Sequence, residues 1–252
     1  MTSGNPPYKL NVGCGRNIKE GWINLDSAAL PGVDLVCDLE SVRAKPISLP
    51  DESVDQFLIS HVIEHIRDSL GLMQDLWRLA TPGAIAVIRV PHGGSDDAWG
   101  DPTHLRAYYP GSFGYFSQPF YSNADYGYRG DWNPDRRTLL VYRSLSAGLS
   151  PQQIISKSQV ERNVVKEMIC EMRAVKPMRE LRRELQTRGQ IENPAGRLRP
   201  RAEPPKKSPP GGEDSGQGGS FSGSGRRETS LGRKRTAAGQ ESEFFSKRCA
   251  PR

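Results

Sequence analysis

The stretch KLNVGCG, residues 9–15, decides how we interpret this chain of 252 residues. Its apolar side chains predict a buried strand, and Gly13 and Gly15 predict a turn at which the backbone approaches a ligand closely. The next apolar run, WINL, ends at Asp26, and its carboxylate can accept hydrogen bonds from ribose hydroxyls. A glycine turn and an acid at the end of the next strand predict a nucleotide-type site. A turn with a purely structural role is the alternative.

Alternating strand and helix signals follow this start. Apolar runs without strict alternation are typical of parallel strands covered on both faces, and residues 72, 76 and 79 are leucines at helical spacing. The run at 168–175 also fits a continued helix, but a final strand would complete the sheet. We expect strands at residues 8–12, 22–25, 33–37, 54–60, 84–90, 138–142 and 168–175, and helices at 70–79, 150–166 and 178–188. The pattern predicts an α/β fold with a doubly wound, mostly parallel sheet.

The connection between the first two strands is short. Only residues 16–21 join them, whereas a crossover between parallel strands normally takes ten or more residues and includes a helix. The first helix is therefore truncated to a turn or two at most.

Charge divides the chain into two parts. Residues 1–143 carry 13 Lys and Arg against 17 Asp and Glu, while residues 144–252 carry 22 against 12, so the net charge of +6 comes from the C-terminal part. After Gly189 the chain has almost no apolar residues, too few to offset the entropy lost on folding. We predict one domain at residues 1–188 and a disordered basic tail, rich in Pro, Gly, Ser and Arg, at residues 189–252.

The spacing of the cysteines and the hydropathy of the chain indicate its cellular compartment. Cys14, Cys37, Cys170 and Cys249 have no C-x-x-C spacing, which argues against a zinc ribbon or a disulfide framework and suits a reducing cytosol. No apolar run approaches the roughly 18 residues that span a membrane, and the first residues lack the apolar core of a signal peptide. We expect a cytoplasmic protein without a membrane span, and the sequence carries no signal of oligomeric state.

Ile18 stands where the dinucleotide fingerprint needs its third glycine, and that fingerprint places its acid about 20 residues further on, so NAD is disfavoured. The residues instead resemble the class I S-adenosylmethionine-dependent methyltransferase family. LNVGCG is similar to its first motif, Asp26 to its ribose-binding acid, and Asp38 in CDLE to its adenine-side acid. The resemblance covers about residues 8–177, with MICEMRAVKP as the last strand. The chain departs from the family in its two-glycine loop and short first connection.

Two further segments carry the resemblance. FLISHVIEHI and the following TPG and AIAVIRVP are similar to the type 11 branch, and DPTHLRAYYP resembles relatives associated with bacterial surface-glycan clusters. The resemblance implies a Rossmann-like methyltransferase fold, S-adenosylmethionine as cofactor, and an oxygen of a sugar, glycan precursor or other small molecule as methyl acceptor. A solvated strand-end acid is the alternative for Asp38. The implied cofactor-binding residues are Gly13, Cys14, Gly15, Asp26, Asp38, Leu39 and His61.

His61, Glu64 and His65 also match the H-x-x-E-H pattern of zinc proteases. On a helix the two histidines would lie on one face and bind a metal, with the glutamate as base. The preceding FLIS predicts a strand that ends at His61, so this helix is not expected. We predict no metal site, keep the zinc hydrolase as a third hypothesis, and place His61 beside the cofactor as a catalytic candidate. For His65, local packing and a site role are both open.

The segment DPTHLRAYYP supplies the candidates for substrate contact. His104 is a natural proton acceptor because its reference pKa is near neutrality, and Asp101 joins it as a catalytic candidate. Arg106 can bind a carboxylate or phosphate through two hydrogen bonds, and Tyr108 begins a run of aromatic residues of which a few stack on a planar substrate while most fill the core. A loop that holds Asp101 and His104 for structural reasons is the alternative.

The tail contains clusters of Lys and Arg at residues 206–207, 226–227 and 233–235. Such clusters bind nucleic acid through counterion release, but acids interrupt these and no aromatic residues separate them, so a solvated tail is the preferred interpretation. The alternative function is a catalytically inactive methyltransferase-fold binding module whose basic tail contacts nucleic acid.

Overall fold

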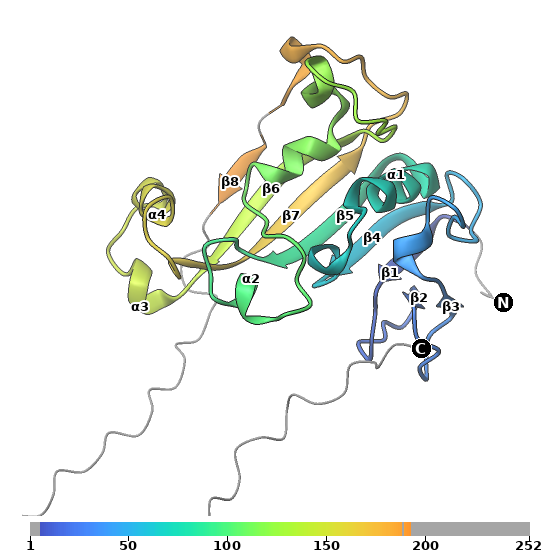
Figure 1. The fold of residues 1–252 in the computed structure, drawn as a ribbon, viewed down its shortest axis with the longest axis horizontal. Helices are drawn as coiled ribbons and strands as arrows, with labels where there is room; N and C mark the ends of the chain where they lie inside the picture. The colour runs from blue at the N-terminus through green and yellow to red at the C-terminus, as the bar shows by residue number, and fades with distance from the viewer. Residues whose placement is uncertain (1–5, 188, 193–252) are drawn as a thin grey trace, which may run out of the picture. The chain divides into compact units, whose positions relative to one another are not determined.

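In the computed structural model, which describes residues 6–187 and 189–192, eight strands form one sheet in the order β3-β2-β1-β4-β5-β7-β6-β8 (Figure 1). Neighbouring strands from β3 to β5 are parallel, and β7 is antiparallel to both β5 and β6. The predicted α/β fold with a mostly parallel sheet is confirmed, and the strand order reverses at β1 as in a doubly wound sheet. The strands are β1 Tyr8–Val12, β2 Ile23–Asp26, β3 Leu35–Val36, β4 Val54–Ser60, β5 Ala80–Pro91, β6 Trp132–Val141, β7 Val165–Ala174 and β8 Gln190–Glu192.

The truncated first helix is also confirmed, because the described residues between β1 and β2 contain only turns. Two buried asparagines replace the hydrogen bonds that a helix would make internally. The Asn24 side chain accepts from Asn11 at 3.0 Å and from the Lys19 backbone at 2.8 Å, and donates to the Lys19 carbonyl at 3.1 Å. Asn11 also donates to the Asn17 carbonyl at 2.9 Å. Side-chain amides therefore satisfy the backbone of this short connection, which explains how it joins two parallel strands.

Helix α1, Ser69–Leu79, covers one face of the sheet. It begins at Asp68, whose carboxylate accepts a hydrogen bond from the Gly71 backbone at 2.8 Å and caps the first turn. Its apolar side packs into the core, as its spacing predicts. The buried residues on that side are Leu72, Met73, Leu76 and Leu79.

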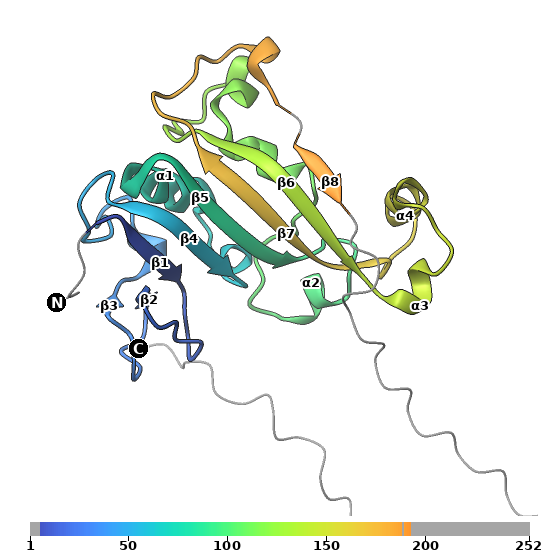
Figure 2. The same ribbon diagram turned by 180° about the vertical axis from the view of Figure 1, so that it is seen from behind.

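The other face of the sheet is less covered than predicted. Figure 1 shows α1 and the short helix α2, Asp97–Gly100, in front of the sheet, whereas in Figure 2 strands β4, β5 and β7 face the viewer with no described helix over them. On this face Leu58, Val87 and Ile169 are only half-buried. Cover on both faces was inferred from the apolar content of the strands, but burial alternates along β4 and β5, so within the described residues that inference is wrong.

The C-terminal half confirms part of the predicted pattern. β7 corresponds to the strand predicted at 168–175, although β8 follows it, and β6 extends the strand predicted at 138–142 at its N-terminal end. Helix α4, Pro151–Ser158, begins at the predicted cap Ser150 but ends eight residues before the predicted 166, and α3 is Arg143–Ser146. The predicted helix at 178–188 is wrong, since within the described residues 178–187 the one helical element is the 3-10 turn η5, Arg183–Leu185.

The boundary of the folded part differs slightly from the prediction. β8 pairs with β6 beyond residue 188, so residues 190–192 belong to the sheet rather than to a tail. The rest of the predicted tail lies outside the described residues. Among the described residues, no helix has both the length and the hydropathy needed to cross a membrane.

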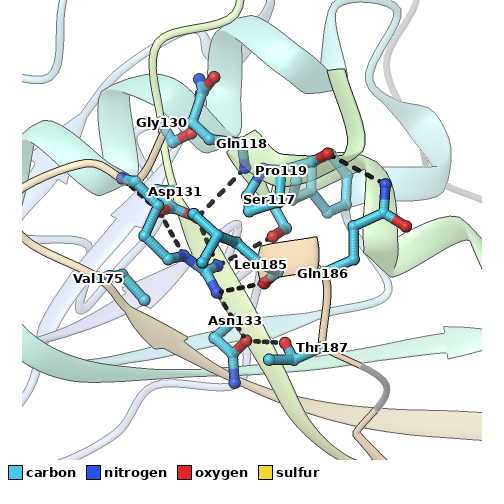
Figure 3. A network of polar contacts seen from close by, with 12 residues as sticks. Ser117, Gln118, Pro119, Gly130, Asp131, Asn133, Val175, Leu185, Gln186 and Thr187 are labelled. Carbon is cyan, nitrogen blue, oxygen red and sulfur yellow. Dashed lines mark hydrogen bonds and ion pairs between the residues drawn. The ribbon is translucent and has the colours of Figure 1, made fainter. Parts of the chain in front are cut away.

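The aromatic segment between β5 and β6 contains two 3-10 helices, η3 Ser112–Phe116 and η4 Gln118–Ser122, and five of its ten Phe, Tyr and Trp rings are buried. An ion pair between the buried Asp131 and the half-buried Arg179 joins this segment to the chain after β7. Asp131, with a 0% exposed side chain, accepts hydrogen bonds from the Arg179 Nε at 2.8 Å and Nη2 at 2.7 Å (Figure 3). Arg179 also donates to Ser117 Oγ at 2.9 Å, so one guanidinium ties three chain segments together.

Candidate active site

The glycine turn after β1 adopts the backbone conformation that its sequence predicts. Gly13 and Gly15 have φ angles of +61° and +53°, in the left-handed region that favours glycine. A Cβ added at Gly13 would lie 2.5 Å from Val62 Cγ2, whereas a Cβ at Gly15 would meet no atom within 4 Å. Gly13 is therefore required for packing against the segment after β4, and Gly15 leaves space that a ligand can enter.

Asp26 lies at the carboxyl end of β2 and closes the glycine turn. Its Oδ2 accepts a hydrogen bond from the Gly15 backbone at 2.7 Å, and its Oδ1 accepts one from the Ala28 backbone at 3.0 Å. Each carboxylate oxygen has a second lone pair, so Asp26 can still accept hydrogen bonds from a ligand. The predicted pair of glycine turn and acid therefore lies together at one edge of the sheet.

The residues on either side of this pair have evident structural roles. Asp38 is exposed and caps the 3-10 helix η1, Leu39–Ser41, by accepting from the Glu40 backbone at 3.0 Å and from Ser41 Oγ at 2.7 Å. The Leu39 side chain is buried in the core, and Cys14 is buried beneath the turn. Burial raises the pKa of the Cys14 thiol, which keeps it protonated at neutral pH. Of these three residues, Asp38 is the one with a side chain at the surface.

His61 follows β4 directly and has a φ of +55°, which is uncommon for a residue with a side chain. Its backbone N–H donates to the Arg89 carbonyl at 2.8 Å, which holds the residue at the end of the strand. The imidazole is 39% exposed, with Nδ1 3.3 Å from Glu64 Oε1 and Nε2 3.9 Å from Glu167 Oε1. Strained backbone is retained where the surroundings enforce it, often at functional sites.

The segment H-V-I-E-H does not form the helix that a zinc protease needs. His61 ends a strand, and residues 63–65 form the single 3-10 turn η2, Ile63–His65. His61 and His65 are therefore not one helical turn apart on a common face, and the zinc-protease arrangement does not form in this segment.

The segment containing Asp101 and His104 packs directly on H-V-I-E-H. The Leu105 backbone donates to the Glu64 carbonyl at 2.8 Å, and the Tyr108 hydroxyl donates to the Ile63 carbonyl at 3.3 Å. The two motifs that the sequence analysis treats separately are thus one structural unit.

The structure corrects the expectation that Tyr108 contacts the substrate. Its ring is 3% exposed and stacks on Phe113, so it has no free face for a substrate. Burial raises the pKa of Tyr108 to about 12. Arg106 is exposed but engaged, since its guanidinium donates to the Arg67 carbonyl at 2.6 Å and to Ser69 Oγ at 3.1 Å. Its contacts anchor the segment to the start of α1.

Asp101 and His104 lie near each other, with Oδ2 and Nε2 4.0 Å apart. Asp101 accepts hydrogen bonds from the Thr103 backbone at 2.9 Å and from Thr103 Oγ1 at 2.6 Å, which hold the pKa of its carboxyl below its usual range. The His104 side chain is only 8% exposed, and its Nδ1 lies 3.0 Å from the Ala98 carbonyl. The geometry therefore favours His61 over His104 as the histidine that can reach a substrate.

Glu167 is the site residue that sequence reasoning missed. It projects from β7 beside His61 and forms an ion pair with Arg89 of β5. Its position follows from the antiparallel pairing of Pro91 with Glu167, and no local sequence signal reveals that register. Two surface hollows in the described structure lie elsewhere. One is lined by residues that include Gln118, Asp125 and Arg179, the other by residues that include Arg43, Asp75 and Arg78.

Neither a family model nor a curated protein matches this sequence. Similar solved structures include a SAM-dependent methyltransferase from Archaeoglobus fulgidus, with 18% identity, a TM-score of 0.46, and coverage of 67% of this chain and 86% of that chain. A SAM-dependent methyltransferase from Mesorhizobium loti has 12% identity, a TM-score of 0.39, and coverage of 69% and 93%. The 1,6-didemethyltoxoflavin-N1-methyltransferase of Burkholderia thailandensis, solved with S-adenosylhomocysteine, has 11% identity, a TM-score of 0.41, and coverage of 69% and 73%. At these identities the likeness concerns fold alone.

Proposed function

We propose that this chain is a methyltransferase that uses S-adenosylmethionine and methylates an oxygen of a sugar, a glycan precursor or another small molecule. The observation that carries the proposal is the arrangement of Gly15 and Asp26. The space beside Gly15 and the carboxylate of Asp26 lie where a doubly wound sheet binds nucleotides, at the carboxyl ends of its strands.

The position of this pair in the sheet supports the same conclusion. β1 lies between β2 and β4, so the strand order reverses beside it and leaves a crevice at the switch point. In our proposal Gly13, Cys14 and Gly15 bring backbone to the cofactor, Asp26 binds the ribose hydroxyls, and Asp38 and the Leu39 backbone border the adenine. The bound cofactor supplies a methyl group on a sulfonium, which is transferred to the acceptor oxygen.

The chain then has two tasks, to align the acceptor and to remove its proton. We assign the removal of this proton to His61, whose side chain is 39% exposed and which lies at the same edge of the sheet. Glu64 and Glu167 flank its ring at 3.3 and 3.9 Å and are placed to stabilise the positive charge that it gains. Asp101 and His104 stabilise the segment that packs beside His61. Arg106 could contact an anionic substrate once it exchanges its hydrogen bonds to Arg67 and Ser69 for bonds to that substrate.

The test is calorimetric titration of the purified chain with S-adenosylmethionine and with S-adenosylhomocysteine. We expect saturable binding of both at a stoichiometry of one. The absence of binding for both compounds would overturn the proposal. Binding without methyl transfer to any of a panel of nucleotide sugars and free sugars would favour the inactive binding module instead.

A further inference from the structure

The carboxylate of Glu64 lacks hydrogen bonds in a place where water does not reach it. The residue is 1% exposed, and neither of its side-chain oxygens accepts a hydrogen bond from the described part of the chain. His61 Nδ1 lies 3.3 Å from Oε1, within ion-pair distance but without hydrogen-bond geometry. A buried carboxylate that accepts no hydrogen bond costs several kcal/mol, so a positive charge beside it would be stabilising.

Two histidines face this carboxylate. His65 and His104 have ring centroids 4.7 Å apart in an edge-to-face arrangement. One ligand atom from each of Glu64, His65 and His104 can be chosen such that all three lie within 4.8 Å of one another. We propose that these three residues bind a divalent transition-metal ion.

The outer contacts of both rings are those of metal ligands. His65 Nδ1 lies 3.0 Å from Thr103 Oγ1 and 3.3 Å from the Thr103 carbonyl, and His104 Nδ1 lies 3.0 Å from the Ala98 carbonyl. Histidines that bind metals usually donate one ring N–H to a carbonyl or carboxylate, which fixes the ring and presents the other nitrogen. Because Nδ1 is engaged in both rings, we infer that Nε2 of each ring binds the ion; His104 Nε2 also lies 4.0 Å from Asp101 Oδ2.

The spacing of the three ligand atoms, up to 4.8 Å, is slightly wider than in a site that contains its metal ion. A tetrahedral zinc site with bonds of about 2.1 Å separates its ligand atoms by about 3.4 Å, so side-chain rotations of an ångström or so would close this cluster. Two imidazoles and one carboxylate suit zinc, iron, cobalt or nickel and disfavour magnesium and calcium, which take oxygen ligands. Three protein ligands leave at least one coordination position for water or a substrate oxygen.

The site joins two segments that are distant in sequence. Glu64 and His65 follow β4, and His104 lies in the segment after β5, so an ion would fasten the second segment onto the first beside His61. The site shares Glu64 with the proposed proton transfer, but metal binding is measured without cofactor or acceptor, so its test is independent of methyl transfer.

The experiment uses the full chain, stripped with a chelator and titrated with Zn²⁺ by calorimetry and with Co²⁺ by visible absorption. We expect one equivalent of each ion to bind, and we expect Zn²⁺ to raise the thermal midpoint of the wild type, since an ion that binds only the folded state stabilises it. Glu64→Gln, His65→Ala and His104→Ala should each weaken binding tenfold or more and abolish the thermal shift.

The matched control is His92→Asn, which removes an imidazole outside the cluster and should leave metal affinity unchanged. Far-UV circular dichroism establishes that each variant is folded, and Glu64→Gln keeps the shape of the side chain should an alanine variant fail to fold. Metal affinity that is equal in the wild type and in folded Glu64→Gln would overturn the proposal. So would a thiolate charge-transfer band with Co²⁺, because it would assign the ion to a cysteine.

Discussion

The backbone N–H of Gly15 donates to Oδ2 of Asp26 at 2.7 Å, and this bond joins the turn after β1 to the end of β2. The same carboxylate thus shapes the glycine turn and offers its remaining lone pairs to the space beside Gly15. Structure and proposed ligand binding are coupled through this one side chain, and substitutions at Asp26 should affect both.

Asp26→Asn tests that coupling. The amide group replaces one oxygen and brings an N–H group to face either the Gly15 or the Ala28 N–H, so one hydrogen bond is lost. We expect a loss of about 1–3 kcal/mol in the free energy of unfolding and at least a tenfold weaker affinity for S-adenosylmethionine. Urea unfolding and calorimetry measure the two effects. Unchanged cofactor affinity in a folded variant would contradict the proposed ribose contact.

The two glycines of the turn should respond differently to alanine. Gly13→Ala adds the strain of a left-handed residue, about 1–2 kcal/mol, to a clash with Val62, so its cost should exceed that of Gly15→Ala. Gly15→Ala meets open space and should lose only the strain energy, while its methyl group hinders the ligand. Unfolding curves and cofactor titrations of both variants check this contrast. Val62→Ala in the Gly13→Ala background should recover part of the stability, and equal losses in both glycine variants would contradict the packing argument.

His61→Asn tests the assignment of the base. We expect a fall in kcat of about 10²–10⁴-fold with an acceptor that the wild type methylates, while the Kd for the cofactor changes little. His92→Asn is the control, because that buried histidine lies outside the site. A wild-type rate in His61→Asn would exclude His61 as the base.

Local sequence patterns were sufficient to predict the parallel half of the sheet. Apolar runs that end in Gly13 and Asp26 predict where the chain stops being a strand, and the carboxyl ends of parallel strands meet at one edge, so the juxtaposition of turn and acid followed. The truncation of the helix before β2 was predictable from the small number of residues that join the first two strands. The asparagine pair that makes it feasible was not, because Asn11 and Asn24 read as ordinary polar residues until their strands are paired.

The rest of the site depends on contacts between segments far apart in sequence. Glu167 reaches His61 only through the register of β7 on β5, and His104 reaches Glu64 only because its segment pairs with the turn after β4. Tyr108 was expected at the substrate and is instead buried, since the sequence of an aromatic segment does not say which rings fill the core. The sequence therefore predicted individual residues with suitable chemistry, but not the residues that contact them in the fold.

The ion pair of Asp131 and Arg179 should contribute strongly to stability. Arg179→Met leaves the buried Asp131 carboxylate without its charged partner and should cost about 3–5 kcal/mol, whereas Asp131→Asn leaves a guanidinium that is 19% exposed and should cost less. The double variant should cost less than the sum of the single variants, because neither charge remains. Asp125→Asn, which removes an exposed pair with Arg129, is the control and should leave the urea midpoint nearly unchanged. Additive losses in the double variant would show that the two charges do not act as a pair.

Buried tyrosines predict a loss of stability at alkaline pH, and burial raises the pKa of Tyr128 as well as those of Tyr108 and Tyr121. Burial raises the pKa of both Tyr108 and Tyr121 from 10.0 to about 12. Below pH 10 the phenols are protonated in the folded and the unfolded chain, so this contribution to stability is complete. Between pH 10 and about 12 the unfolded chain releases these protons and the folded chain retains them, so the free energy of unfolding falls as pH rises, by roughly 2 kcal/mol for each tyrosine.

Urea unfolding at pH 9, 10 and 11 measures this fall, and phenolate absorbance reports the ionisation itself. Other groups also titrate in this range, so the decisive comparison is between the wild type and Tyr108→Phe. The variant loses the hydrogen bond to the Ile63 carbonyl and should be less stable at pH 9. Its stability should then decrease less steeply with pH, because one of the protected phenols is gone. Parallel pH profiles for the wild type and the variant would show that Tyr108 ionises normally in the folded chain.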